Sequence, residues 1–203
     1  MTAAVERTFL HVGCGAQDKR SIEKGFNSPD WREIRFDIDP GVKPDIVGTL
    51  TDLSAVGSES VDALYSSHSI EHIFPHEVAT ALGEFHRVLK ADGFLVITCP
   101  DLQSVCEFVA RDQLVDTLYV SPMGPIAAID IMYGHRASIA NGQTYMAHKC
   151  GFTDSVLRRC VLAAGFQTLY GGRRPAAFDL WLIAFKSKVS QDALLRAAAT
   201  YLP

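Results

Sequence analysis

The 203-residue chain has no long apolar run, no excess of basic residues and no Cys-x-x-Cys spacing. Its longest apolar stretch, residues 180–185, is far too short to span a bilayer. The first seven residues contain no apolar signal segment. The net charge of −4 gives no broad electrostatic attraction to nucleic acid. We therefore expect a cytoplasmic protein that binds neither a membrane nor nucleic acid.

The cysteine count is odd, and no pair has the spacing of a metal or redox motif. Five cysteines without such a pattern are typical of free thiols in a reducing compartment. With 48% apolar and 21% charged residues, the composition is that of an ordinary globular protein. A chain of this length is expected to form a single domain with a full core. The cysteines are Cys14, Cys99, Cys106, Cys150 and Cys160.

A Gly-Cys-Gly turn near the start of the chain is the feature around which the prediction is built. Residues 9–12 form an apolar run that is typical of a strand buried on both faces, and Gly13, Cys14 and Gly15 follow it directly. In open α/β sheets, ligands bind at the carboxyl ends of the strands where the strand order reverses. We therefore expect a nucleotide-like ligand to lie across this turn.

An acidic pair follows about twenty residues later, after the second apolar run, and indicates a ribose. A carboxylate at the end of a second strand, such as Asp37 or Asp39, can accept hydrogen bonds from both ribose hydroxyls. A dinucleotide fingerprint has a third glycine where this chain has Asp18, whose charge would repel a phosphate. Residues 16–31 also read as a loop. The ligand should have a ribose but no diphosphate, which fits S-adenosylmethionine.

Periodicity along the chain predicts strands that alternate with helices or long crossovers, and hence a largely parallel sheet. The apolar positions after Pro75 recur at intervals of three and four, which predicts a helix to about Lys90 with one buried face. Asp101 is predicted to cap the next helix. The expected strands are 9–12, 33–38, 45–50, 61–65 and 94–99, followed by a helix over 153–164 and a final hairpin of 166–170 with 178–185.

The segment of about 111–152 is expected to be a loop-rich insertion on the substrate side. A long segment with little regular structure is usually functional or mobile. It carries Tyr133, His135, Tyr145 and His148, which are candidates to contact a substrate or, alternatively, to hydrogen-bond the loop to itself. The same segment could form the contact of a homodimer.

Several segments together resemble the class I S-adenosylmethionine-dependent methyltransferases, in particular small stand-alone bacterial members. The resemblance covers residues 7–110 best. Its Ser-Ser-His-Ser-Ile-Glu-His-Ile block, with the Arg-Val-Leu-Lys-x-x-Gly that follows, is more specific than Gly-Cys-Gly. The matching segments are 11–15, 36–40, 66–73, 84–93, 100–102 and 163–166.

This resemblance implies an α/β fold: a Rossmann-like three-layer sandwich whose seven-stranded, mostly parallel sheet has its last strand antiparallel. It also implies S-adenosylmethionine as cofactor, with Gly13, Cys14 and Gly15 along its methionine part and ribose. Asp37 would bind the ribose hydroxyls. The remaining implied cofactor contacts are Ile38 against the adenine, Thr49 and Leu50 at the adenine edge, and Ser67 and His68 beside the sulfonium.

Three features depart from the family pattern. Family members often have an acidic residue or Asn where this chain has His11, and an acidic residue is common where it has Thr49. The helix after the glycine turn looks shortened. These departures motivate the alternative that the chain is a non-catalytic binding module that keeps the fold and acts through a partner.

The run His68-Ser-Ile-Glu71-His72 spells the inverted zinc-protease motif His-x-x-Glu-His. That spacing suits zinc only on one helix, and Pro75 limits any helix here to about a turn. We therefore predict no metal, with Glu71 and His72 as a hydrogen-bonded cap under the pocket. His68 either lines the pocket or packs.

The function predicted from the sequence is methyl transfer from S-adenosylmethionine to a small-molecule acceptor. Methyl transfer from a sulfonium is an in-line displacement that depends on the positioning of the acceptor. A base is needed only if the acceptor must lose a proton, so the fold dictates no fixed catalytic residue. The substrate-side candidates are His68, His135, Tyr145 and His148. A nicotinamide-dependent dehydrogenase is disfavoured by Asp18.

Overall fold

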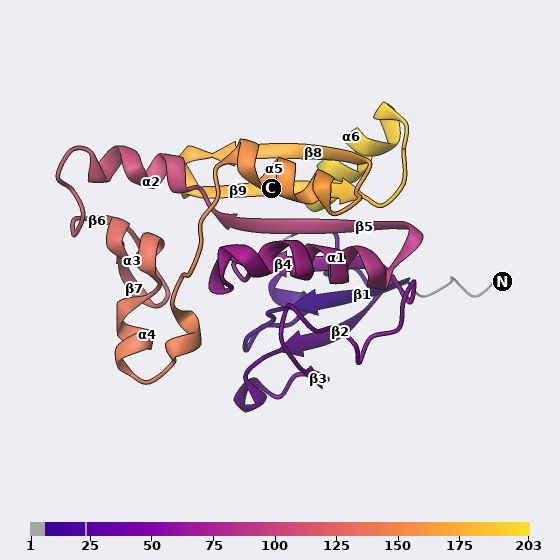
Figure 1. The fold of residues 1–203 in the computed structure, drawn as a ribbon, viewed down its shortest axis with the longest axis horizontal. Helices are drawn as coiled ribbons and strands as arrows, with labels where there is room; N and C mark the ends of the chain where they lie inside the picture. The colour runs from indigo at the N-terminus through magenta and orange to yellow at the C-terminus, as the bar shows by residue number, and fades with distance from the viewer. Residues whose placement is uncertain (1–6, 23) are drawn as a thin grey trace.

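A seven-stranded sheet runs through the centre of the molecule in the order β3-β2-β1-β4-β5-β9-β8 (Figure 1). The structure is a computed structural model that describes residues 7–22 and 24–203. β9 is antiparallel to both of its neighbours, and the pairings among β3, β2, β1, β4 and β5 are all parallel. This confirms the predicted Rossmann-like sheet with its last strand antiparallel.

The predicted strands all form, with shifted ends. The third is the shortest, because Pro44 precedes it and the chain turns away at Gly48. The strands of the main sheet are β1 Arg7–Val12, β2 Trp31–Asp37, β3 Ile46–Val47, β4 Val61–Ser67, β5 Leu89–Pro100, β8 Thr168–Arg174 and β9 Asp179–Phe185.

The helix α1 (Val78–Val88), which connects β4 to β5, forms as its apolar spacing predicts. Pro75–Glu77 forms a 3₁₀ turn and leads into α1, which buries Val78, Ala81, Leu82, Phe85 and Val88. These side chains join one core with Leu157 and Val161 of α5 (Asp154–Ala163), so α1 and α5 cover the same face of the sheet. Asp101 caps α2 (Leu102–Val109) as predicted, because its carboxylate accepts the Gln103 N–H.

An aromatic cluster and the last helix cover the opposite face. Among the described residues between β1 and β2, 13–22 and 24–30, the only helical element is the 3₁₀ turn Lys19–Ser21. Phe26 and Trp31 instead pack against Tyr201 of α6 (Gln191–Tyr201), with ring centroids 4.9 and 6.2 Å from that of Tyr201. The sequence analysis did not predict α6, which protects the face of the sheet that the shortened connection leaves open.

The insertion at 111–152 is more regular than the sequence predicted. It contains the hairpin β6 Thr117–Ser121 with β7 Gly124–Ala127, then α3 Ala128–Tyr133, α4 Arg136–Ala140 and a 3₁₀ turn, Thr144–Met146. A small core shared with α2 and the end of the β8–β9 connection supports it, through Val105, Ile126, Ala128, Ile131 and Phe178.

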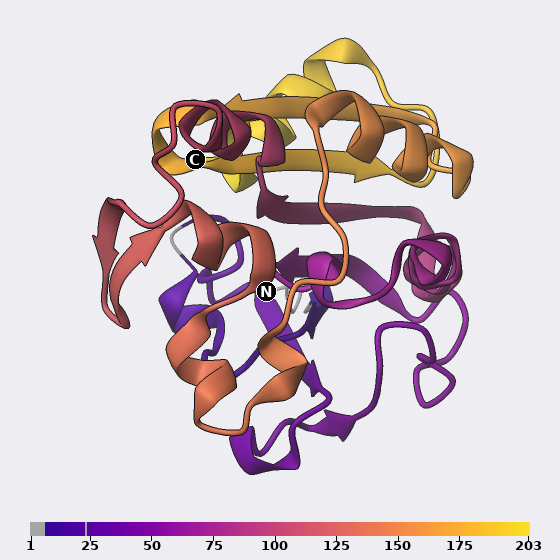
Figure 2. The same ribbon diagram turned by 60° about the vertical axis from the view of Figure 1, so that its left-hand side comes forward.

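The insertion lies at the end of the sheet toward which β1, β2 and β5 point (Figures 1 and 2). Ligands of open α/β sheets bind at that end. The insertion is therefore placed where it can cover a ligand. Within the described part of the chain, no helix combines the length and apolar character needed to cross a bilayer.

Removal of the Tyr201 ring tests the role of α6 in the fold. Tyr201 is 9% exposed and packs against Phe26, Trp31 and Phe94. We expect Tyr201→Ala to lower the free energy of unfolding by about 3 kcal/mol, because it leaves a cavity among these rings. Urea denaturation measures the change. Arg196→Ala, on the exposed side of the same helix, should change stability by no more than about 0.5 kcal/mol. Equal effects of the two substitutions would contradict this role.

Candidate functional site

The glycine turn lies at the switch point of the sheet, because β1 pairs with β2 on one side and with β4 on the other. Gly13 (φ +67°) and Gly15 (φ +53°) both adopt the left-handed backbone conformation that glycine tolerates best. The Gly13 N–H donates to the Phe36 carbonyl (2.8 Å). A Cβ on Gly13 would lie 2.0 Å from Ser69 Oγ, whereas one on Gly15 would meet no atom within 4 Å. Space for a ligand is therefore open at Gly15.

The Asp37 carboxylate connects this turn to the end of β2. Its Oδ2 accepts the Gly15 N–H (2.7 Å) and its Oδ1 accepts the Asp39 N–H (2.9 Å), and the residue is 8% exposed. An ionised carboxylate has about four acceptor positions. Two of them remain for other donors, such as a pair of ribose hydroxyls.

The residues predicted to contact an adenine lie beside this carboxylate, on β2–β3. Ile38 follows Asp37 directly and is 49% exposed, so it presents an apolar surface to the outside of the protein. Thr49 is exposed, and its hydroxyl lies 3.1 Å from that of Thr51. Leu50 packs partly against the main core. The structure thus places an exposed apolar side chain next to a carboxylate that can accept further hydrogen bonds.

His11 forms a buried pair with Glu33 on the aromatic face of the sheet. Its Nδ1 lies 2.7 Å from Glu33 Oε1, and Glu33 Oε2 accepts the Lys19 N–H (2.8 Å). The His11 ring also packs edge-on to Tyr65. The carboxylate behind the glycine turn is therefore that of Glu33 on β2, and not that of a residue on β1.

Cys14, between the two glycines, is 3% exposed. Burial raises the pKa of its thiol to about 11, although the nearby Arg35 opposes this effect. At neutral pH the thiol therefore stays protonated and is a poor nucleophile. It is a small side chain in the turn and not a reactive group.

Ser67 and His68 lie where β4 ends, beside the glycine turn. The Ser67 carbonyl accepts the hydroxyl of Ser69, the side chain that packs against Gly13. His68 has a φ of +48°, which is unusual for a residue with a side chain, and its imidazole is 49% exposed. Its N–H donates to the Thr98 carbonyl on β5. Such backbone strain is common at functional sites.

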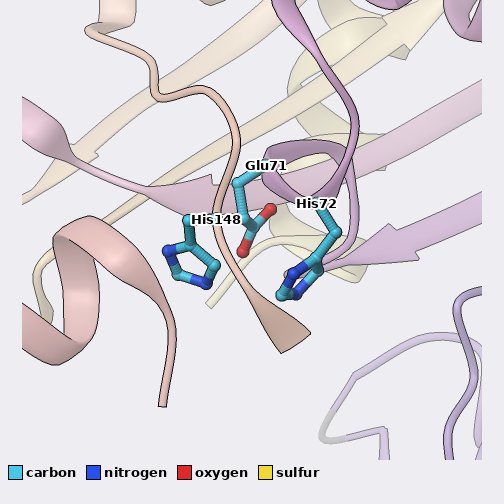
Figure 3. Close-up of side chains that lie close together, drawn as sticks. All are labelled: Glu71, His72 and His148. Atoms are coloured by element: carbon cyan, nitrogen blue, oxygen red, sulfur yellow. The ribbon is translucent and has the colours of Figure 1, made fainter. Parts of the chain in front are cut away.

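Behind His68, the structure brings Glu71 and His72 together with His148 of the insertion (Figure 3). Glu71 and His72 lie on a 3₁₀ turn, Ile70–His72, as Pro75 predicted. The ligand atoms of the three side chains lie within 4.8 Å of one another. His72 Nδ1 contacts the Ala147 carbonyl (3.2 Å), so this histidine does make a hydrogen bond under the pocket.

The Glu71 carbonyl accepts the N–H groups of Lys149 and Cys150, so its backbone is part of the cap, but its carboxylate is not. Glu71 is 1% exposed, and neither carboxylate oxygen has a hydrogen-bond partner among the described residues. The nearest cationic group is His68 Nδ1, at 3.5 Å from Oε1. Burial by itself would raise the pKa of Glu71, but His68 and the charges of His72 and His148 lower it overall. Glu71 is thus a buried carboxylate surrounded by imidazoles.

A cavity of about 160 Å³ adjoins these groups, between the end of the sheet and the insertion. Its polar lining includes His68, Glu71, His72, His135 and His148. Burial lowers the pKa of His148 below its usual value, against the opposing charge of Glu71. The described structure therefore gathers four histidines and two carboxylates around this small cavity, and the second carboxylate, Asp130, is paired with Arg136.

The residues of the insertion that were predicted to contact a substrate do not all lie at the same place. His135 and His148 line the cavity, and His135 Nδ1 lies 2.8 Å from Ser138 Oγ. Tyr145 extends to the cofactor side instead, where its hydroxyl donates to Asp39 Oδ2 (2.8 Å). Tyr133 is 59% exposed, although it borders a neighbouring cavity. Sequence reasoning recognised His-x-x-Glu-His but missed its association with His148, because no local spacing connects the two segments.

Comparison with known proteins agrees with this geometry. Residues 10–97 match the family model described as a methyltransferase domain. No curated protein matches the sequence significantly. Among solved structures, a methyltransferase of Methanosarcina mazei described as SAM-dependent has a TM-score of 0.57 at 17% identity, with 89% of this chain and 93% of that chain covered.

Two further structures illustrate the range of sizes. The 1,6-didemethyltoxoflavin-N1-methyltransferase of Burkholderia thailandensis, solved with 1,6-didemethyltoxoflavin and S-adenosylhomocysteine, gives a TM-score of 0.54 at 16% identity, covering 89% of this chain and 71% of that one. A protein of Bordetella parapertussis gives a TM-score of 0.56 at 17% identity, and the match covers 90% of this chain and 62% of that one. The chain thus spans less than two thirds of the length of that protein.

The family match covers the glycine turn, Asp37 and the Ser67–His72 segment, and the structural likeness extends over 89–90% of the chain. Residues 10–97 thus match a methyltransferase domain, and the chain as a whole has the fold of solved structures described as SAM-dependent methyltransferases.

Proposed function

We propose that the protein transfers a methyl group from S-adenosylmethionine to a small-molecule acceptor. The observation that carries this proposal is the Asp37 carboxylate, which is fixed by the Gly15 and Asp39 amides at the end of β2 and has two acceptor positions left. A ribose presents two vicinal hydroxyls, which suit such a carboxylate. The match of residues 10–97 to a methyltransferase domain supports a sulfonium as the methyl donor.

The residues around Asp37 also suit the adenine and the ribose of the cofactor. Ile38 offers an exposed apolar side chain for the face of an adenine, and the open space over Gly15 admits a ribose without a steric clash. Tyr145, held by Asp39, can close this side of the site against water. Asp18 forms an ion pair with Arg20 near the same turn, which leaves a carboxylate where a diphosphate would otherwise bind.

The acceptor is proposed to bind in the histidine-lined cavity under the insertion. A volume of about 160 Å³ suits a small molecule or one end of a larger one, and the net charge of −4 gives no attraction for nucleic acid. The Burkholderia thailandensis methyltransferase binds its small heterocyclic substrate within this fold. That precedent supports an acceptor of similar class here.

In such a reaction, the chain's own residues orient the acceptor and exclude water. Positioning can supply roughly 7–11 kcal/mol of the barrier reduction in favourable cases. His68 follows β4 beside the glycine turn and also lines the cavity, so it connects the two parts of the site. Either His68 or His135 can accept a proton from an acceptor that must lose one.

The Asp37→Asn substitution tests the cofactor site. It keeps the size of the side chain but removes its charge and one acceptor oxygen, and hydrogen bonds to charged groups contribute roughly 1.5–3 kcal/mol each. We expect the Kd for S-adenosylhomocysteine to rise at least about tenfold, measured by calorimetric titration. Asp92→Asn, an exposed position at the opposite end of the sheet, is the control and should bind as the unmodified protein does. An unchanged affinity of Asp37→Asn would contradict the proposed ribose contact.

The two glycines of the turn give a second test, because an added methyl group acts differently at each. Gly15→Ala places it in open space, so we expect a stability loss of only about 1–2 kcal/mol from the left-handed backbone but a clear loss of S-adenosylhomocysteine affinity. Gly13→Ala adds a clash with Ser69 to the same backbone cost, so it should destabilise the fold more. Thermal unfolding and calorimetry separate the two effects. Unchanged affinity of Gly15→Ala would place the ligand elsewhere.

A further inference from the structure

We propose that Glu71, His72 and His148 bind one divalent transition-metal ion of the zinc class, with an open coordination position toward the cavity. This goes beyond methyl transfer, because the site lies behind His68 and shares no residue with the proposed cofactor contacts. It also departs from the prediction of no metal, which considered only a single helix bearing both histidines of the His-x-x-Glu-His run.

The donor set matches known metal sites in proteins. Two imidazoles and one carboxylate ligate zinc in hydrolytic enzymes, where a fourth position stays open. The same combination binds Fe(II) in oxygenases. Nitrogen ligands disfavour Mg²⁺ and Ca²⁺, which prefer oxygen. The chemistry of Glu71, His72 and His148 therefore selects a transition metal.

The geometry needs only a small contraction to enclose an ion. The three ligand atoms lie within 4.8 Å of one another. Bonds of about 2.0–2.1 Å in a tetrahedral site place ligand atoms roughly 3.3 Å apart. Figure 3 shows the Glu71 carboxylate between the two imidazoles, so all three groups already converge on one region.

Both histidines are oriented as metal-binding histidines usually are. His72 Nδ1 lies 3.2 Å from the Ala147 carbonyl, and His148 Nδ1 lies 2.7 Å from the Ile131 carbonyl. A carbonyl only accepts, so Nδ1 carries the proton in each ring and Nε2 keeps its lone pair in the neutral form. Such hydrogen bonds to the second ring nitrogen fix the orientation of metal ligands.

The Glu71 carboxylate is the independent observation that points to a ligand. It is 1% exposed, and neither of its oxygens has a hydrogen-bond partner among the described residues. An ionised carboxylate is costly to bury unless it is paired or coordinates a metal. The nearest imidazole nitrogen, on His68, is at 3.5 Å, which is too long for a strong hydrogen bond. A cation between Glu71 and the two histidines would satisfy this carboxylate.

The position of the site would allow such an ion to contact a molecule bound in the cavity. All three side chains line the cavity of about 160 Å³ that also contains His68 and His135. An ion held there would present its open position to the cavity, where an oxygen or nitrogen atom of a bound small molecule can coordinate. The metal site would then bind and orient the molecule in the cavity.

Metal titration of the full chain tests the proposal. The purified protein is treated with EDTA, dialysed and titrated calorimetrically with Zn²⁺. We expect one equivalent to bind with micromolar or tighter affinity, and Co²⁺ to give the visible absorption of a low-coordinate nitrogen and oxygen site. Since loss of an outer-shell partner already costs about 10–100-fold in affinity, Glu71→Gln and His148→Asn should each weaken binding by about a hundredfold or more. His76→Asn, at an exposed histidine, is the matched control and should bind as the unmodified protein does.

The outcomes separate this proposal from the proposed function. No stoichiometric binding, or binding that Glu71→Gln and His148→Asn leave unchanged in variants whose thermal unfolding shows them to be folded, would overturn the metal site. Titration of the same metal-free protein with S-adenosylhomocysteine tests the cofactor site independently. Binding of the cofactor product without zinc would therefore remove only the metal proposal, and zinc binding without the cofactor product would remove only the methyl-transfer proposal.

Discussion

The hydrogen bond from the Gly15 amide to the Asp37 carboxylate is the constraint on which the proposed cofactor site depends. It connects the turn after β1 to the end of β2, at the point where the order of the sheet reverses. Gly13 is held in the same turn by the Phe36 carbonyl and by the close approach of Ser69 from the segment after β4. Three strand ends are therefore fixed relative to one another before any ligand binds, and such preorganisation lowers the entropic cost of binding.

The fold keeps this site although the described residues between β1 and β2 form only a 3₁₀ turn. The last helix, α6, instead covers the aromatic face of the sheet and packs against Phe26 and Trp31. His11 and Glu33 form a buried pair under the same cover. His11 stands where family members often have an acidic residue or Asn, and it is paired here with Glu33. The carboxylate behind the glycine turn thus comes from the neighbouring strand. The departures at His11 and in the first crossover are matched by other contacts and leave the strand order intact.

Much of the architecture could be predicted from the sequence, because buried parallel strands and an amphipathic helix such as α1 have strong local patterns. The spacing of the glycine turn and Asp37 predicts that they meet at one edge of the sheet, and the hydrogen bond from Gly15 to Asp37 shows that they do. The helix α6 does carry a local start signal, the Ser190 cap, but its role cannot be predicted from local pattern because it covers an aromatic cluster formed by distant residues. The association of Glu71 with His148 was also out of reach, because it depends on how the insertion packs against the end of the sheet.

The most direct test of the account is a calorimetric titration of the purified protein with S-adenosylhomocysteine, with NAD as the comparison ligand. The Asp37 carboxylate, the open space over Gly15 and the carboxylate of Asp18 predict micromolar binding of S-adenosylhomocysteine and none of NAD. Binding of NAD, or of neither ligand, would contradict the account. Binding of NAD would indicate a dinucleotide enzyme. Binding of neither ligand would favour a module that keeps the methyltransferase fold and acts through a partner.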